Sequence, residues 1–176
     1  MSRADRKAHG RFRADAETKR ILDGMENWRN AFGDYVQYYH IDRGASQWDE
    51  IYEEPIADGL VYDDPIALPC MHVTHVRGGD TYGELGGYYE DSLSATVAFR
   101  QMAESGLPFA DIETGDYQYD RLVYDHKVFR VISVSVRGQI QQRDTVVVID
   151  AQQLKPDMLV TDAQFAQYAS SSTASR

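Results

Sequence analysis

The residue types best suited to bind a metal lie close together in the motif Cys70-x-His72-x-x-His75. Side chains of an extended strand alternate between its faces, so Cys70 and His72 would share one face and His75 would point to the other. A structural zinc site also needs a fourth ligand, usually from a second pair at matching spacing, and the other histidines are scattered along the chain. We therefore expect a strand with ordinary histidines, with a zinc site as the weaker alternative.

A group of acids before the last third of the chain is the other candidate for chemistry. Asp111, Glu113, Asp116 and Asp120 have the density of a carboxylate pair or a divalent-ion loop. They lack the turn glycine and the final glutamate of a calcium loop. We expect these carboxylates to be solvated.

Nucleophilic and phosphate-binding patterns are weaker still. The glycines of residues 77–89 are not followed by Lys-Ser or by a helix start, as a phosphate cradle requires. No serine lies in a nucleophile-elbow context, and Cys70 has no basic neighbour to favour its thiolate. We predict no catalytic residue and no cofactor, and a metal- or carboxylate-dependent hydrolase is the least favoured class.

Length and composition favour one domain with appendages, since 176 residues fit the usual single-domain range. The single cysteine excludes an internal disulfide and indicates a reducing compartment. No stretch has the apolar length of a membrane span, and the N-terminus has no signal-peptide core. We expect a protein made and used in a cytoplasm, or in a particle assembled there.

The charge of the chain is unevenly distributed. Residues 1–20 carry seven basic and three acidic side chains, which gives this segment a charge of +4. Because the whole chain has a net charge of −10, the remaining residues carry −14. A basic arm on an acidic body predicts contact with an acidic protein or nucleic acid, although a solvated leader fits equally well. Nucleic-acid wrapping by the body is not expected, because it lacks the clustered Lys and Arg that bind phosphate.

The expected elements define a mainly β protein, a small antiparallel β-barrel or sandwich with long loops and an N-terminal amphipathic helix. We divide the chain into a flexible basic arm (1–15), the helix (16–40), a β-domain (41–160) and a disordered serine-rich tail (161–176). The helix prediction rests on apolar residues at three- and four-residue steps: Ile21, Met25, Trp28, Phe32, Tyr35 and Tyr39. Gly33 weakens the helix and favours a break near this position. A single helix with such a stripe is stable only when the apolar side chains pack against the β-domain or against a neighbouring subunit.

Strands are expected at residues 66–77, interrupted by Pro69, and at residues 93–102. Residues 116–154 predict a three-stranded meander, because β-branched residues alternate with tight-turn signals at residues 125–126 and 137–138. A glycine-rich hairpin is expected over residues 77–89. The twelve tyrosines are many for this length, and tyrosine suits interfaces because it buries a large area while its hydroxyl finds a polar partner.

Several features follow one another in a fixed order. They are an aromatic and acidic segment (48–55), a second acidic segment ending in IALP (62–69), the glycine-rich hairpin (81–86), a strand (93–99), and the terminal pattern DRLVYD…FRV (120–131), which leads through Gly138 to residues 146–151. In order and spacing, residues 45–155 resemble the head-to-tail connector proteins of long-tailed bacteriophages, in particular the stopper, or head-completion, family.

The resemblance implies a small β-barrel and a hexameric or dodecameric ring of identical subunits at the head–tail neck of a virion, assembled in the host cytoplasm. Its partners would be a portal or adaptor protein and a tail-tube or tail-terminator protein. Double-stranded DNA would pass through the ring without sequence-specific binding, and no membrane would be involved. An adaptor or tail-terminator ring stays open, because the N-terminal forty residues exceed a minimal stopper. The competing class is a small DNA-binding module that uses its basic arm.

Two residue sets follow from this reading. The candidate gating hairpin comprises Arg77, Gly78, Gly79, Asp80, Thr81, Tyr82, Gly83, Gly86 and Gly87. The residues expected to dock on a neighbouring subunit or ring are Arg3, Arg6, Lys7, Arg11, Arg13, Trp28, Phe32, Tyr35, Tyr39, Trp48 and Tyr52.

Overall fold

A computed structural model describes residues 14–48, 59–83, 86–107, 116–140, 143–160 and 162–169. The basic residues of the arm (Arg3, Arg6, Lys7, Arg11 and Arg13), Tyr52, and the acids Asp111 and Glu113 lie outside the described residues. The elements are α2 (Ala14–Phe32), β1 (Asp34–Tyr39), β2 (Ile66–Cys70), β3 (His72–Gly83), β4 (Gly86–Ala98), α3 (Phe99–Glu104), η1 (Asp116–Tyr119), β5 (Arg121–Tyr124), β6 (Lys127–Ile140), β7 (Arg143–Gln153), α5 (Pro156–Val160) and α6 (Ala166–Ala169).

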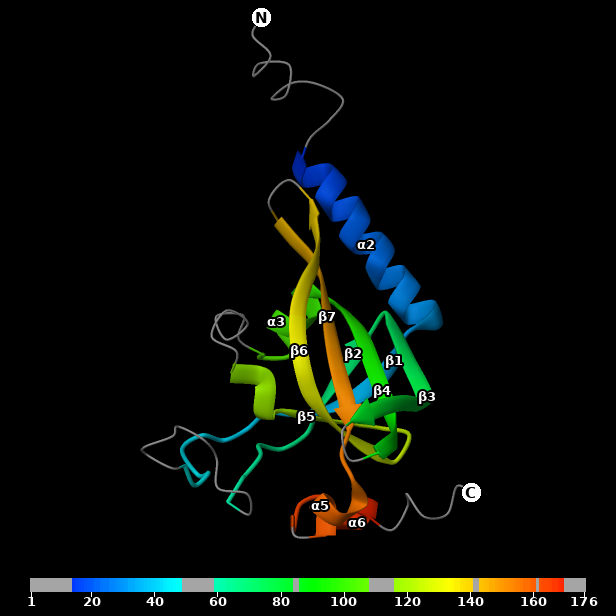
Figure 1. Cartoon of the computed structure of the whole chain (residues 1–176). Helices are drawn as coiled ribbons and strands as arrows, with labels where there is room; N and C mark the ends of the chain where they lie inside the picture. The colour runs from blue at the N-terminus through cyan, green and yellow to red at the C-terminus, as the bar shows by residue number, and fades with distance from the viewer. Residues whose placement is uncertain are drawn as a thin grey trace, which may run out of the picture.

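The strands form one seven-stranded antiparallel sheet in the order β2-β1-β5-β6-β7-β4-β3 (Figure 1). This confirms the prediction of a mainly β fold with an N-terminal helix. The sheet is not closed into a barrel, however. The edge strands β2 and β3 follow one another along the chain and separate at Met71, whose backbone N–H donates to the Thr96 carbonyl at 2.8 Å. Because β2 pairs with β1 and β3 pairs with β4, the two edges are joined by a covalent corner and not by a ladder.

The main hydrophobic core includes the inward residues of β4. Leu93, Ala95 and Val97 are buried, and the residues between them are more exposed, as the two-residue period of a strand requires. Phe129 of β6 is fully buried in the same cluster, and Met102 of α3 contributes to it from outside the sheet. The expected strand over residues 93–102 thus ends at Ala98, where α3 takes over.

The helix ends at Phe32, so the expected helix over residues 16–40 is wrong for residues 34–39, which form β1. Gly33 explains the position of the break. Its N–H donates to the Arg29 carbonyl at 2.7 Å, and a Cβ at this position would lie 2.4 Å from the Arg29 oxygen and 2.6 Å from the Cys70 oxygen. The chain therefore passes the end of β2 at a separation that only glycine permits.

The predicted three-stranded meander is confirmed as β5, β6 and β7. Asp125 and His126 form a two-residue turn with φ of 49° and 60°, which matches the left-handed conformation that tight hairpins use. The second predicted turn is wrong, because Gly138 lies within β6 at a register shift. The strand predicted over residues 66–77 is interrupted at Met71 and not at Pro69. Met71 separates β2, which ends at Cys70, from β3, which begins at His72.

Part of the expected disordered tail belongs to the folded body. Phe165 is fully buried, and the Gln164 side chain accepts from the Tyr62 N–H at 3.0 Å and donates to the Tyr62 carbonyl at 2.9 Å. The prediction of a tail beginning at residue 161 is therefore wrong for residues 162–169. Residues 170–176 lie outside the described residues.

Candidate functional site

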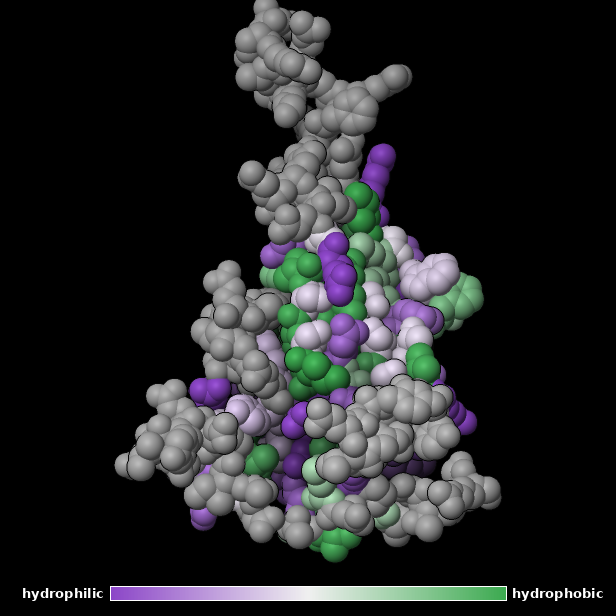
Figure 2. All heavy atoms as spheres, viewed as in Figure 1, coloured by the Kyte–Doolittle hydropathy of each residue, from purple (hydrophilic) through white to green (hydrophobic). Residues whose placement is uncertain are grey.

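Three large side chains are exposed together where α2 meets β1. Trp28, Phe32 and Tyr35 are 57%, 71% and 64% exposed, and the rings of Trp28 and Phe32 lie 4.8 Å apart. We call these three residues the aromatic face. Figure 2 shows side chains projecting from this part of α2 at the right of the view.

Other residues of α2 hold the helix against α3 and the end of β4. Leu22, Met25 and Arg29 are half-buried and line a small cavity of about 120 Å³ with α3 and the end of β4. The Arg29 guanidinium donates to the side-chain oxygen of Gln101 in α3. The apolar stripe read from the sequence is therefore split: Met25 faces the body, and the aromatic face does not.

The other predicted docking residues lie elsewhere. Tyr39 is only 7% exposed and packs edge-on against Phe165, with 4.8 Å between ring centroids. Trp48 is half-buried and packs edge-on against Tyr119 at 5.5 Å. Tyr39 is therefore a core residue, and of the described docking residues only the aromatic face is both exposed and grouped.

The predicted hairpin exists as β3 and β4, whose ladder runs to the pair Gly83 and Gly86. Its register shifts between Val76 and Gly79, and Gly78 adopts a φ of 67° at this bulge. The turn residues 84–85 are outside the described part of the chain. A gating role for Asp80, Thr81, Tyr82 and Gly87 stays a prediction.

Asp91 of β4 anchors this bulge and ties it to the meander. Its carboxylate accepts from the Gly78 N–H at 2.8 Å and from the Lys127 ammonium, and it lies 3.0 Å from His75 Nε2. Burial alone would raise the Asp91 pKa, but hydrogen bonds from Lys127, Gly78 and His75 lower it to about 2. Asp91 is therefore a carboxylate held ionised by its partners.

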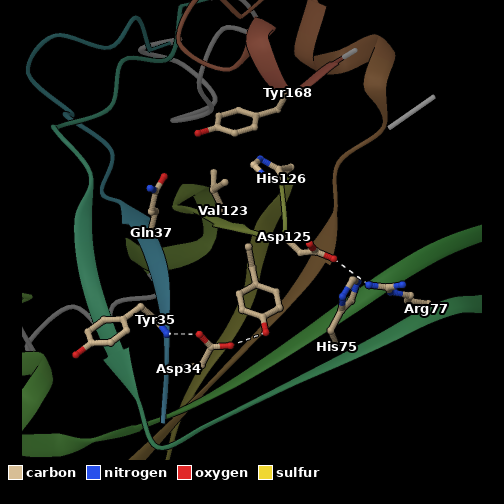
Figure 3. A pocket seen from close by; sticks show the side chains of 10 residues that line it. Asp34, Tyr35, Gln37, His75, Arg77, Val123, Asp125, His126 and Tyr168 are labelled. Atoms are coloured by element: carbon tan, nitrogen blue, oxygen red, sulfur yellow. Dashed lines mark hydrogen bonds and ion pairs between the residues drawn. The ribbon is translucent and has the colours of Figure 1, made fainter. Parts of the chain in front are cut away.

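A polar groove of about 750 Å³ lies beside this network. It is lined by Asp34, Tyr35, Gln37, His75, Arg77, Val123, Tyr124, Asp125, His126 and Tyr168. Figure 3 shows Asp34 and Tyr35 toward the left of the groove and the ion pair of Arg77 with Asp125, 2.9 Å long, toward the right. The groove thus joins the start of β1, the bulged part of β3, the β5–β6 turn and α6.

Asp34 is the more isolated carboxylate of the groove. It accepts from the Tyr124 hydroxyl at 2.6 Å and from the Tyr35 N–H at 2.8 Å. The hydrogen bond to Asp34, followed by burial, raises the pKa of Tyr124 to about 12. Tyr124 therefore remains a neutral donor to the Asp34 carboxylate.

The residues of the sequence-derived metal motif do not converge. Cys70 is fully buried in the core, where burial raises its thiol pKa to about 12, whereas His72 is exposed and His75 is bound to Asp91. Within the described ranges, no three His, Cys, Asp or Glu side chains are grouped to hold a metal ion.

No helix among the described residues has the length and apolar character needed to cross a membrane.

Asp120, which we expected to be solvated, is fully buried. Its carboxylate accepts from the Tyr38 hydroxyl and from the Ile41 N–H at 2.9 Å, and it lies 2.9 Å from His40 Nδ1. This residue joins β1 to the start of β5. The acids near Asp120 in the sequence suggested solvent, but its position two residues before the apolar pair Leu122-Val123 of a predicted strand was a signal of burial.

The next residue, Arg121, is buried as well. It pairs with Asp162 and stacks on the rings of Tyr62 and Phe165, 4.7 and 4.6 Å from their centroids. Burial raises the pKa of Tyr62 to about 12, although the nearby Arg121 charge opposes the shift. This cluster holds the C-terminal helices on the sheet.

Sequence reasoning gave no site role to the groove residues Asp34 and Asp125 or to Asp91 beside the groove. Asp125 carried one usable signal, since an Asp-His pair between two strand-like runs predicts a tight turn. Asp34 lies in an aromatic segment and Asp91 follows Glu90 after a glycine-rich one, and nothing in their spacing relates them. Their proximity results from the pairing of β1 with β5 and the bulge in β3.

No protein-family model matches the chain, and no curated protein matches it. Among solved structures, a chain from the structure described as "Virion of native gene transfer agent (GTA) particle" is similar over 69% of this chain and 94% of its own length. The two are 12% identical, with a TM-score of 0.43. Identity and TM-score at this level do not assign a function to the chain.

Proposed function

We propose that the protein is a structural component of a phage-like virion, and that it forms a stopper ring at the head-to-tail neck. The aromatic face carries this proposal. Trp28, Phe32 and Tyr35 are all more than half exposed, and grouped large apolar side chains at a protein surface usually mark a partner's binding site. This role agrees with the order of features that residues 45–155 share with the stopper family.

The placement of a second apolar surface supports a ring. Met158 and Val160 of α5 are 58% and 66% exposed, and α5 lies at the bottom of the view in Figure 1, apart from the C-terminal end of α2 that carries Trp28 and Phe32. When two different surfaces of one chain meet in neighbouring copies, the contact is head-to-tail and generates a closed ring if the rotation closes. The aromatic face of one copy against α5 of the next would be such a contact.

The charge of the body supports passage of DNA. Residues 21–176 carry −14, and a surface of that sign repels phosphate and prevents adhesion of DNA inside a ring. The hairpin of β3 and β4 is the candidate gate, and its bulge at Gly78 is held by the carboxylate of Asp91.

Sedimentation of the full chain tests the ring. We expect the wild type to sediment as a hexamer or dodecamer, and the double variant Trp28→Ala/Phe32→Ala as a monomer. Ile132→Ala is the matched control, because Ile132 is a half-exposed apolar residue of β6 and its loss should leave the ring intact. A monomeric wild type, or a double variant that still forms rings, would contradict the proposal. A salt-dependent shift of DNA by a monomeric chain would favour the DNA-binding module instead.

The position in the neck needs a test in particles. Deletion of residues 78–87 should yield filled heads that lose their DNA, because the gate is missing while the ring surfaces remain. The measurement is DNA retained per head after nuclease treatment. Full retention would remove the gating role, and particles that never fill would place the protein at another step of assembly.

A further inference from the structure

Asp34 is a groove carboxylate without a positive partner in the part of the chain that the structure describes. Its acceptor bonds come from the Tyr124 hydroxyl and the Tyr35 N–H, which are both neutral. The ion pairs among the described residues involve other carboxylates, with Asp125 the one paired inside the groove. The groove therefore offers one unneutralised charge at the Asp34 end.

The surroundings of Asp34 suit a guanidinium or ammonium group. The Tyr35 ring is 64% exposed, and Tyr124 lines the same groove. A carboxylate next to aromatic rings binds a cation through both the charge and the ring faces, and arginine is best matched because it is planar and weakly hydrated. The volume of about 750 Å³ accommodates several side chains of an extended peptide.

The far side of the groove can take a second cation. Arg77 and Asp125 form a pair whose side chains are 68% and 50% exposed. Exposed ion pairs of this kind are weak because solvent screens both charges, so an incoming arginine can share or replace Arg77 at little cost.

The chain itself carries a segment of matching chemistry. Residues 1–13 contain five basic side chains and one acidic side chain, a charge of +4. We propose that this basic arm binds in the groove of a neighbouring copy of the chain. The inference rests on the proposed assembly of identical subunits, and it names the groove as the receptor for the arm.

The geometry of α2 favours a neighbouring copy over the arm's own groove. Helix α2 has 19 residues and is about 28 Å long at 1.5 Å per residue. The helix ends next to Asp34. Ala14, where the arm joins the helix, therefore lies a helix length away from the groove of the same chain (Figure 1). To fill that groove, the chain would have to reverse its direction before Ala14 and run alongside the whole helix. The groove of a neighbouring copy can be reached without that reversal.

Cross-linking of mixed-isotope protein tests the inference. Full-length chains labelled with ¹⁴N and ¹⁵N are mixed and treated with a carbodiimide, which couples lysine to carboxylates. Lys7 is the only lysine of the arm, and we expect mixed-isotope peptides that link Lys7 to Asp34 or Asp125. Asp34→Asn should remove the first link and lower the second about fivefold, the factor for about 1 kcal/mol of lost ion pairing.

Two further variants define the result. Asp64→Asn removes an exposed carboxylate outside the groove and should leave both links unchanged. Changing Arg3, Arg6, Arg11 and Arg13 to Gln keeps Lys7 and should lower both links. Links of a single isotope would show binding within one chain and overturn the inference, as would the absence of groove links.

Sedimentation of the same samples separates this inference from the proposed function. Rings without groove links would overturn the arm's binding site and leave the stopper proposal standing. Monomers without groove links would overturn both.

Discussion

Two regions of this protein are rich in aromatic residues and differ in how those residues are covered. In the cluster around Arg121, the rings of Tyr62 and Phe165 are buried and stacked on the guanidinium. On the aromatic face, the rings of Trp28 and Phe32 contact each other and remain more than half exposed.

The two regions differ in whether their side chains are paired and covered by other residues of the chain. The Arg121 cluster satisfies its own polar groups, with Asp162 paired to the guanidinium and Asp120 bonded to Tyr38 and Ile41. The described residues of the chain leave the aromatic face more than half exposed. Aromatic residues of the first kind therefore stabilise the fold, and those of the second kind are accessible to a partner.

The largest effect expected is on the buried side of this comparison. Asp120→Ala should lower the free energy of unfolding by about 3 kcal/mol, because it removes a buried carboxylate that accepts from the Tyr38 hydroxyl and from the Ile41 N–H. Urea unfolding of the variant and of Asp64→Asn, an exposed acid, gives the measurement and its control. A loss below about 1 kcal/mol would mean that Asp120 is not the junction between β1 and β5.

An intermediate effect is expected for Asp91, beside the groove, and it depends on pH. The Asp91 pKa is lowered from 3.8 to about 2, so the folded state binds its proton less readily than the unfolded state does. The stabilisation is therefore complete above about pH 4 and is lost as the pH falls toward 2.

The comparison of wild type with Asp91→Asn measures this contribution. The difference between their free energies of unfolding should be constant from pH 7 to about 4 and shrink between pH 4 and 2. Asp64→Asn, which changes an exposed carboxylate outside this network, serves as the control. A constant Asp91→Asn difference down to pH 2 would show that the ionised carboxylate is not what holds the Gly78 bulge.

The smallest effect on folding is expected for the aromatic face. Trp28→Ala/Phe32→Ala should change the free energy of unfolding by less than about 0.5 kcal/mol at concentrations where the chain is monomeric, because both side chains are largely exposed. Thermal and urea unfolding of dilute protein give this value. A loss above about 1 kcal/mol would mean that the face stabilises its own chain and would remove the contrast with the Arg121 cluster.

The meander and the helix were predictable because their patterns are local. Alternation in residues 127–136 and the Asp125-His126 turn mark two strands and their connection. The helical stripe was read too far, since Tyr35 and Tyr39 happen to continue the helical spacing after Gly33. Their spacing fits a strand as well, and the close passage of Cys70 decides between the two.

The groove was not predictable in this way. Asp34, Asp91 and Asp125 come from three separate strands or turns, and their distance along the chain carries no sign of contact. The burial of Asp120 was missed because its acidic neighbours in the sequence suggested a solvated segment. Its hydrogen bonds from Tyr38 and Ile41 join residues far apart in the chain and leave no local pattern.

The sequence by itself determined the mainly β character, the N-terminal helix, the meander and the separation of a basic arm from an acidic body, because each follows from local period or composition. The tertiary structure decided that the sheet stays open at a corner between β2 and β3, that Phe165 belongs to the core, and that the stripe of α2 is split between α3 and solvent. These properties depend on which strands pair and which surfaces meet, and such contacts join residues that no local pattern connects.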